Sequence, residues 1–373
     1  MKKSTLYSVL IIFLSIIIIF FSVCYLILPQ KSFSDNENRV LQVMPNFSAE
    51  KLWNGEFSRQ LHSYLTDQIA LREKMIEIKA ICNLVLGRRE NNGVILAKDS
   101  YLIERYCYTE KNYEFLQSNL NKIERLTDKL NGYGTNIISV LIPRKEDVLV
   151  SKLPSIHSNE RCERIWELVS SSHLLLLESF KNSQDLNVDI YYKTDHHWTN
   201  DGAYCAYVFL SEHLGFSPLS IEDFNLMTIS NEFYGTSYSK SGFFFTKPDA
   251  IICPELNADR YKTIIMDTGK SLDGIWDFDY LSTKDKYSVF LSGNNAHVKI
   301  TDMQDTTKDT LLLIKDSFSH SLVPYLLMHY NLELIDPRYY SGSIEKYITE
   351  NNINNVLFLL WIDTLSSSNI SIR

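Results

Sequence analysis

The sequence predicts an α/β domain built on a parallel β-sheet and attached to a membrane by an N-terminal helix. Two observations lead to this fold class. From about residue 93 onward, short apolar runs alternate with amphipathic helical stretches, which is typical of βαβ units. Residues 4–28 contain no charged side chain, and about 20 apolar residues suffice to span a bilayer. At 373 residues, the chain is too long for one small domain and short for three.

The apolar N-terminal run sets the expected location of the rest of the chain. Residues 6–28 are almost wholly apolar, and Lys2 and Lys3 precede them. Because basic residues flanking a span stay in the cytoplasm, we expect everything after Gln30 to lie outside. A cleaved signal peptide is the alternative. The run is longer than the apolar region of a signal peptide, however, and no small-x-small cleavage site follows it. We therefore expect residues 1–30 to form a cytoplasmic tip and a lasting anchor in the lipid bilayer.

Residues 31–92 are expected to connect the anchor to the main domain. Residues 29–46 are polar and suggest a short exposed leash, while residues 48–87 place apolar side chains at helical spacing. Gly87 is a plausible helix stop. These helices are expected to form a collar, although a plain helical stalk is equally compatible. The main domain then covers residues 93–373.

Within the main domain, a β-hairpin is predicted over residues 94–103, followed by alternating helices and strands. The expected elements are helices at 113–130, 158–179, 200–213, 318–329 and 344–348, and strands at 137–142, 188–192, 311–314, 332–335 and 356–360. The interval of about 215–309 breaks this alternation with aromatic and β-branched runs and turn residues. We interpret it as a β-rich insertion.

Composition excludes several functions. The net charge of −8 argues against nucleic-acid binding, which favours a basic face. Cys24 lies in the apolar run, and the other five cysteines show no C-x-x-C spacing: Cys82, Cys107, Cys162, Cys205 and Cys253. Zinc sites usually need such pairs, so a metal site is not indicated. The odd number of cysteines outside the apolar run leaves at least one thiol unpaired or paired between chains, so a disulfide framework is not indicated either. No cofactor is predicted.

The first chemically suggestive stretch is residues 194–202, Thr-Asp-His-His-Trp-Thr-Asn-Asp-Gly. It follows a predicted strand and precedes a predicted helix, where open α/β sheets place their sites. Asp195 and His197 are two residues apart, so in an extended loop the carboxylate can reach the imidazole. The competing interpretations are that Asp195 only caps the loop and that Thr199 or Asn200 caps the following helix. His196 and His197 as metal ligands are disfavoured, because adjacent histidines usually point apart.

The second stretch is residues 311–321, in which a buried strand ends at Asp316-Ser317 and a helix begins. A helix N-terminus offers unpaired N–H groups and a positive dipole, which stabilise an oxyanion. The competing interpretation is that Asp316 or Ser317 is simply an N-cap. The co-occurrence with Asp-x-His at another strand end favours catalysis.

Asp-His-His-Trp at 195–198, together with Lys-Asp-Ser-Phe at 315–318, resembles the DHHW protein family. That family is similar to the SGNH-hydrolase-like proteins of alginate and other cell-surface polysaccharide O-acetylation. The similarity runs from about residues 37–39, Glu-Asn-Arg, to the end of the chain. The serine motif comes last, as in that circularly permuted group and unlike ordinary SGNH hydrolases. The resemblance implies a flavodoxin-like, three-layer α/β/α fold, with Ser317 as nucleophile, His197 as base and Asp195 as its orienting acid.

The chain departs from the family pattern at the serine block. SGNH enzymes usually read Gly-Asp-Ser there, whereas Lys315 occupies the glycine position. Glycine helps backbone N–H groups approach the substrate, so the oxyanion donors are left open. Candidate oxyanion or substrate residues are Asn294, Asn295 and Phe318. His320 is expected to be structural.

These features predict a membrane-anchored, extracytoplasmic serine acyltransferase or esterase acting on a cell-surface polysaccharide. By analogy with the resembled systems, a membrane-bound O-acyltransferase would supply the acyl groups. Transfer to a sugar hydroxyl and hydrolysis by water both remain open. The alternative is a non-catalytic envelope protein that keeps the fold as a polysaccharide-binding or assembly module. Convergence of Ser317, His197 and Asp195 distinguishes the two.

Overall fold

The computed structural model describes residues 3–27, 29–132, 134–155, 160–185 and 188–372. The chain divides into two compact units. The first comprises Met1–Asn92 with Tyr238–Phe244, and the second comprises Gly93–Ser237 with Phe245–Arg373. A short part of the predicted 215–309 insertion therefore belongs to the first unit.

The first unit begins with the apolar helix α1 (Lys3–Ile27). Among the described residues, α1 is the one helix long and apolar enough to cross a membrane, a property shared by anchors and signal sequences. The rest of the unit consists of short strands and three helices, namely β1 (Phe33–Ser34), β2 (Arg39–Val40), α2 (Ala49–Trp53), α3 (Glu56–Asp67), α4 (Arg72–Val85) and β3 (Glu90–Asn91).

Ion pairs attach part of residues 29–46, the segment predicted to be an exposed leash, to helices α3 and α4. Arg39 donates to Asp67 at the end of α3, at 2.5 and 3.0 Å, and Arg72 of α4 pairs with Glu37. Glu37 and Arg39 belong to the Glu-Asn-Arg stretch with which the family resemblance begins. Their side chains therefore tie residues 37–39 to α3 and α4, and this part of the leash is held rather than free.

The second unit is built on an eight-stranded sheet with the order β11-β10-β12-β14-β13-β15-β6-β7. Its strands are β6 (Asn136–Ile142), β7 (Leu174–Leu175), β10 (Tyr261–Ile265), β11 (Ser271–Asp273), β12 (His297–Asp302), β13 (Thr310–Lys315), β14 (Asn331–Ile335) and β15 (Asn355–Trp361). Strands β14, β13, β15, β6 and β7 pair in parallel. Strands β12, β10 and β11 extend the sheet antiparallel. The sheet is therefore mostly parallel, and three strands of the predicted insertion join it.

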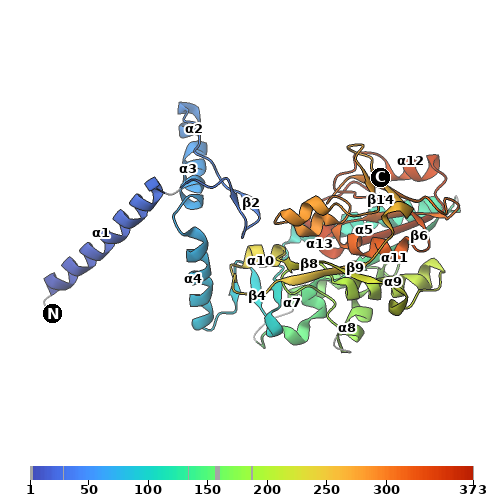
Figure 1. The fold of residues 1–373 in the computed structure, drawn as a ribbon, viewed down its shortest axis with the longest axis horizontal. Coiled ribbons are helices and arrows are strands. Elements are labelled where there is room, and N and C mark those ends of the chain that lie inside the picture. The colour runs from blue at the N-terminus through green and yellow to red at the C-terminus, as the bar shows by residue number, and fades with distance from the viewer. Residues whose placement is uncertain (1–2, 28, 133, 156–159, 186–187, 373) are drawn as a thin grey trace. The chain divides into compact units, whose positions relative to one another are not determined.

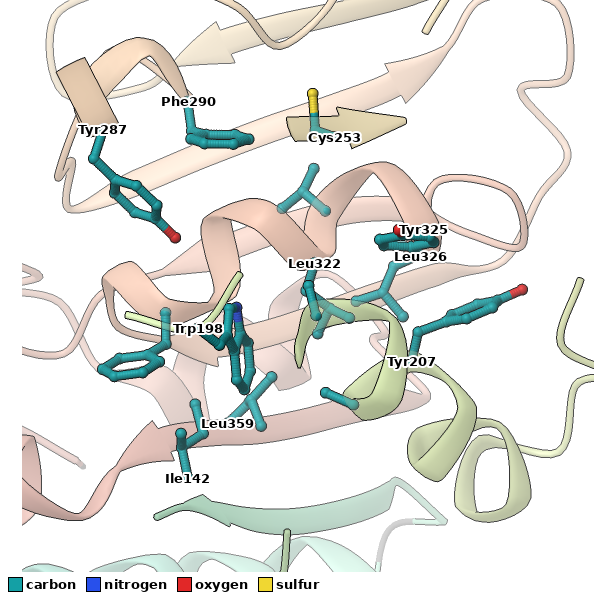
Figure 2. Packing of buried hydrophobic residues seen from close by; sticks show 14 of the residues in the cluster. Ile142, Trp198, Tyr207, Cys253, Tyr287, Phe290, Leu322, Tyr325, Leu326 and Leu359 are labelled. Atoms are coloured by element: carbon teal, nitrogen blue, oxygen red, sulfur yellow. The ribbon is translucent and has the colours of Figure 1, made fainter. Parts of the chain in front are cut away.

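Helices cover both faces of this sheet (Figure 1). Buried side chains alternate along β6, so that Val140 and Ile142 join one core and Leu141 the other. The Leu141 core is covered by α5 (Glu110–Asn131), α7 (Glu160–Glu167), α12 (Ile344–Glu350) and α13 (Ile362–Ser367). The opposite core is covered by α6 (Lys145–Val148), α8 (Leu177–Asp185), α9 (Asn200–Leu214) and α11 (Val323–Leu326). Trp198, Leu322 and Leu359 lie together in it (Figure 2).

The remaining elements of the second unit are hairpin strands and short helices. They are β4 (Val94–Leu96), β5 (Leu102–Glu104), β8 (Leu226–Phe233) and β9 (Asp249–Pro254), with 3-10 turns at 98–100, 150–152, 221–223, 258–260, 278–282, 286–289 and 317–322. Helix α10 (Thr236–Ser241) begins in this unit.

Two sequence predictions, the strand at 188–192 and the helix at 158–179, were wrong. Residues 188–192 do not enter the sheet; they form one isolated bridge, Tyr191 to Trp198. Ile190, Tyr191 and Tyr192 are buried, so their strand-like pattern reflects core packing without a ladder. The helix predicted over 158–179 is instead α7, the short strand β7 and the start of α8. Residues 156–159 lie outside the described part of the chain.

Candidate active site

Ser317 stands at the carboxyl end of the central strand β13, as the sequence predicted. The chain leaves β13 at Asp316 and turns into a 3-10 helix, Ser317–Leu322. Asp316 caps this helix by accepting the Phe318 N–H at 3.0 Å. Its other carboxylate oxygen accepts the Trp361 N–H at 2.7 Å and the Thr364 hydroxyl at 2.8 Å. Asp316 therefore ties the turn that carries Ser317 to the end of the neighbouring strand β15 and to the helix that follows it.

Asp195 and His197 lie in a tight loop rather than at a strand end. The Tyr191–Trp198 bridge closes the loop, and the Tyr192 N–H donates to the His197 carbonyl at 3.2 Å. Thr199 then caps α9 by accepting the Gly202 N–H at 3.2 Å, one of the two capping possibilities derived from the sequence. The loop is thus outside the sheet, although it leads directly into a sheet-covering helix.

The structure brings together the three residues predicted to act in catalysis. His197 Nε2 lies 2.8 Å from Ser317 Oγ, and His197 Nδ1 lies 2.5 Å from Asp195 Oδ1. Asp195 is 2% exposed and His197 is 6% exposed, so little water competes for these bonds. An imidazole held by a carboxylate on one nitrogen and facing a hydroxyl on the other can accept the hydroxyl proton. This arrangement can activate Ser317 as a nucleophile.

The carboxylate of Asp195 is held by residues that sequence reasoning missed. Its Oδ2 accepts the Thr236 N–H at 2.6 Å and the Thr236 hydroxyl at 3.0 Å, and its Oδ1 also accepts the His197 N–H at 2.9 Å. Burial on its own raises the pKa of Asp195, but the imidazoles of His196 and His197 and these hydrogen bonds hold it well below its usual value. Asp195 is therefore ionised near neutral pH. Gly235 and Thr236 lie some 40 positions downstream of Asp195, in no motif that predicts this contact.

His196 was expected to point away from His197, but the two rings lie side by side. Its ring centroid lies 4.0 Å from that of His197, and its Nδ1 lies 2.6 Å from the Thr236 hydroxyl. Its ring also stacks on Trp361 at 5.1 Å. Burial, and then the neighbouring His197, lower the pKa of His196 to about 4. His196 is therefore neutral near pH 7 and is a supporting ring in the wall of the site.

Aromatic rings fix the orientation of His197. Tyr287 stacks on it with a centroid distance of 4.2 Å and an angle of 13°, and Phe318 packs at 4.8 Å. Tyr287 comes from the predicted insertion, and burial raises the pKa of its phenol, which keeps it neutral. Offset and tilted ring contacts of this kind are favourable and directional. The insertion therefore supplies both Thr236 and Tyr287 to the triad's surroundings.

The three candidate oxyanion or substrate residues, Asn294, Asn295 and Phe318, differ in their surroundings. Asn295 donates its amide to the carbonyls of Leu291 at 2.8 Å and Gly293 at 3.3 Å, which closes its own turn. Asn294 is exposed. Within the described chain, neither asparagine hydrogen-bonds to Ser317 or His197. The Phe318 N–H donates a hydrogen bond to Asp316, and the Phe318 side chain is 1% exposed. The structure thus gives Asn295 a turn-closing contact and Phe318 a buried, packed position.

Two basic side chains of residues 311–321, Lys315 and His320, are buried and contact each other. Lys315 Nζ lies 2.8 Å from His320 Nε2, and both side chains are about 1% exposed or less. Burial lowers the pKa of Lys315 to about 8, and burial with the nearby Lys315 lowers that of His320 well below its usual value. His320 contacts Lys315 and is buried, and its structural role stays a prediction.

Asp195, His196 and His197 also form a cluster of potential metal ligands, with one ligand atom of each within 4.8 Å of the others. Both nitrogens of His197 and both carboxylate oxygens of Asp195 are already hydrogen-bonded within the protein. A metal ion would have to displace these bonds, so the donor set fits a triad better than a metal centre. The described cysteines are free thiols: Cys24, Cys82, Cys107, Cys205 and Cys253.

A second serine–histidine pair lies on the α5 face of the sheet. Ser139 Oγ is 2.7 Å from His173 Nδ1, and His173 Nε2 is 3.6 Å from Glu124. These residues line a cavity of about 300 Å³. Ser139 is inside strand β6, where backbone N–H groups are paired in the ladder, so it lacks the oxyanion support of a helix start. The Ser317 site is the better candidate for catalysis.

A mostly parallel α/β/α sheet, with a serine at the end of a central strand and an Asp-x-His loop facing it, defines an SGNH-hydrolase-like domain. Comparisons with known proteins agree. The family model described as DHHW protein matches residues 170–335. The model described as SGNH hydrolase-like domain, acetyltransferase AlgX, matches residues 94–232. The resemblance to the DHHW family and to these acetyltransferase domains, predicted from the sequence, is confirmed.

Solved structures share the fold. A DHHW family protein from Eubacterium siraeum is 20% identical with a TM-score of 0.58, and the match covers 75% of this chain and 94% of that one. Bacillus cereus PatB1 with a sulfonyl adduct is 23% identical with a TM-score of 0.59, covering 74% and 97%. At these identities the likeness concerns the fold alone. A search of the curated proteins gave no match.

Proposed function

We propose that this protein is a serine O-acyltransferase or esterase whose nucleophile is Ser317. The observation that carries the proposal is the 2.8 Å contact between Ser317 Oγ and His197 Nε2, with Asp195 on the opposite nitrogen of the same imidazole. A serine hydroxyl is a weak nucleophile near neutral pH unless a base accepts its proton. A purely binding module has no need of this buried, hydrogen-bonded relay.

The geometry suggests a two-step reaction. Ser317 Oγ attacks the acyl carbonyl while His197 Nε2 accepts its proton, and Asp195 stabilises the resulting imidazolium. The tetrahedral intermediate then collapses, and His197 returns the proton to the departing alcohol oxygen, which leaves an acyl-serine. In the second step His197 takes a proton from the acceptor hydroxyl, whose oxygen attacks the ester. As the tetrahedral intermediate collapses, His197 returns the proton to Ser317 Oγ, which releases the acylated acceptor and restores the free serine.

The acceptor is proposed to be a hydroxyl of a cell-surface polysaccharide, with acetyl as the acyl group. The match to the model described as an acetyltransferase supports acetyl as the acyl group. The polysaccharide acceptor follows from the family resemblance of the Asp-His-His-Trp and Lys-Asp-Ser-Phe motifs. In the same proposal α1 is an uncleaved anchor that keeps the second unit outside the cytoplasm. A membrane-bound O-acyltransferase is the partner proposed to supply the acyl group. With water as acceptor, the same residues would act as an esterase.

The test is turnover of an aryl acetate by variants of the triad. Ser317→Ala and His197→Ala are each expected to lower kcat/KM by at least about 1,000-fold, because they remove the nucleophile or its base. Asp195→Ala is expected to have a smaller effect, since the imidazole keeps some basicity. Circular dichroism and thermal unfolding serve as folding controls. Full activity of a well-folded Ser317→Ala protein would refute the mechanism.

A further inference from the structure

The loop that carries Asp195 and His197 needs an attachment to the sheet. Ser317 is fixed to the sheet by strand β13, but residues 192–197 belong to no strand of it. A displacement of about 1 Å between reacting groups can lower a rate about 100-fold. Some group at the sheet edge must therefore hold this loop in register with Ser317.

We infer that Lys145 is a positioning residue that locks the Asp195–His197 loop against the carboxyl edge of the sheet. Lys145 follows β6 at its carboxyl end and opens α6. Strand β15 is the one strand between β6 and β13, so the edge that supplies Lys145 also supplies Ser317. Neighbouring strands are about 4.8 Å apart, which places the two strand ends about 10 Å from each other.

The ammonium of Lys145 is surrounded by backbone carbonyls of this loop. Lys145 Nζ lies 2.5 Å from the carbonyl oxygen of Tyr192, 3.2 Å from that of Lys193 and 3.1 Å from that of Asp195. A fourth carbonyl, at 2.8 Å, comes from Leu102 of the β4–β5 hairpin. An ammonium has three N–H donors and no acceptor, so it acts as a built-in cation that gathers these oxygens.

Burial makes these contacts strong. Lys145 is 4% exposed, and its ammonium also lies 5.2 Å from the centre of the Tyr101 ring. Burial lowers the pKa of Lys145 to about 8, against the opposing influence of Asp249, Asp195 and Glu104. The side chain is thus mainly charged at neutral pH. The backbone N–H groups of the same loop are bound by a carboxylate. Asp249 accepts the N–H of Lys193 at 2.9 Å and that of Thr194 at 2.7 Å.

The experiment compares the full-length wild type with Lys145→Met and Lys145→Gln, using aryl acetate turnover and inactivation of Ser317 by phenylmethanesulfonyl fluoride. Lys145→Met is expected to lower kcat and the inactivation rate about 100-fold while KM stays within about twofold. Lys145→Gln, which keeps two neutral donors, should fall between. The matched control is Lys152→Met, whose ammonium lies 5.8 Å from the same Tyr101 ring but is half-buried and paired with the exposed Asp99. This control should retain full activity.

A second readout separates positioning from stability. The proton shared by His197 Nδ1 and Asp195 should give a far-downfield NMR resonance in the wild type, and this signal should be lost or shifted in folded Lys145→Gln. Both variants keeping wild-type kcat with an unchanged resonance would overturn the inference. The inference rests on the proposed function, but the two can fail separately. An active Ser317→Ala protein removes the function, whereas active Lys145 variants beside an inactive Ser317→Ala remove the positioning role alone.

Discussion

Substituting Gly235 by alanine should disable the triad of Ser317, His197 and Asp195 although none of these three residues is replaced. A Cβ at Gly235 would lie 2.2 Å from the Cβ of Asp195 and 2.1 Å from its Oδ2. Carbon atoms in contact are about 3.5–4.0 Å apart, so Asp195 has to move by roughly 1.3 Å or more. Gly235 has no left-handed φ, and the effect is therefore steric and directed at one side chain.

The expected magnitude follows from that displacement. A shift of about 1 Å costs about 100-fold in kcat, or about 2.7 kcal/mol in the activation free energy. Overpacking should lower the free energy of unfolding by about 1–3 kcal/mol. The assay is aryl acetate turnover at a temperature where thermal unfolding shows the variant to be folded.

Gly132→Ala is the matched control for this substitution. A Cβ at Gly132 would meet its nearest neighbour, the Lys129 carbonyl oxygen, at an ordinary 3.5 Å, and the backbone there is helical. This variant should keep wild-type activity. Should a folded Gly235→Ala protein keep kcat within twofold of wild type, the contact between Gly235 and Asp195 would have no part in catalysis, and the reasoning would be refuted.

Three further predictions concern other parts of the molecule. Because the pKa of His196 in the folded protein is about 4, protonation favours the unfolded chain. The wild type should therefore lose stability relative to His196→Gln as pH falls from about 6.5 to about 4, by up to about 3 kcal/mol in chemical denaturation; equal slopes would contradict this. Ser139→Ala should leave kcat/KM unchanged, since its pair with His173 is not part of the mechanism, and a large loss would point to that second site. Protease treatment of intact cells should remove the bulk of the chain and leave a small anchored remnant, whereas a mature chain beginning near Ser32 would indicate a cleaved signal peptide.

The serine motif was predictable because its signals are local. The apolar run of β13, the capping carboxylate of Asp316 and the start of a helix at Ser317 lie within a few consecutive residues. Asp195 and His197 were recognisable for the same reason. Their approach to Ser317, 120 positions away from His197, depends on chain packing and was inferred from the family resemblance.

The errors come from features whose cause is distant in the sequence. The buried run Ile190-Tyr191-Tyr192 matches a strand pattern, yet it packs in the core without joining the sheet. Strands β10 and β12 lie in the predicted β-rich insertion, but nothing local shows that β12 pairs with β14 and so extends the main sheet. Thr236 and Lys145 contact the Asp195–His197 loop from 41 and 50 positions away in the sequence, and no spacing rule predicts either contact.

The central claim is that Ser317 becomes acylated during turnover, and trapping that ester tests it most directly. The protein would be mixed with an aryl acetate, quenched in acid within the first turnovers, digested and mapped by mass spectrometry. Our account predicts one acetyl group on the peptide containing Ser317, absent from Ser317→Ala and unaffected by Ser139→Ala. Rapid turnover with an acetyl group on Ser139, or with no acetyl group on Ser317 at any quench time, would contradict it.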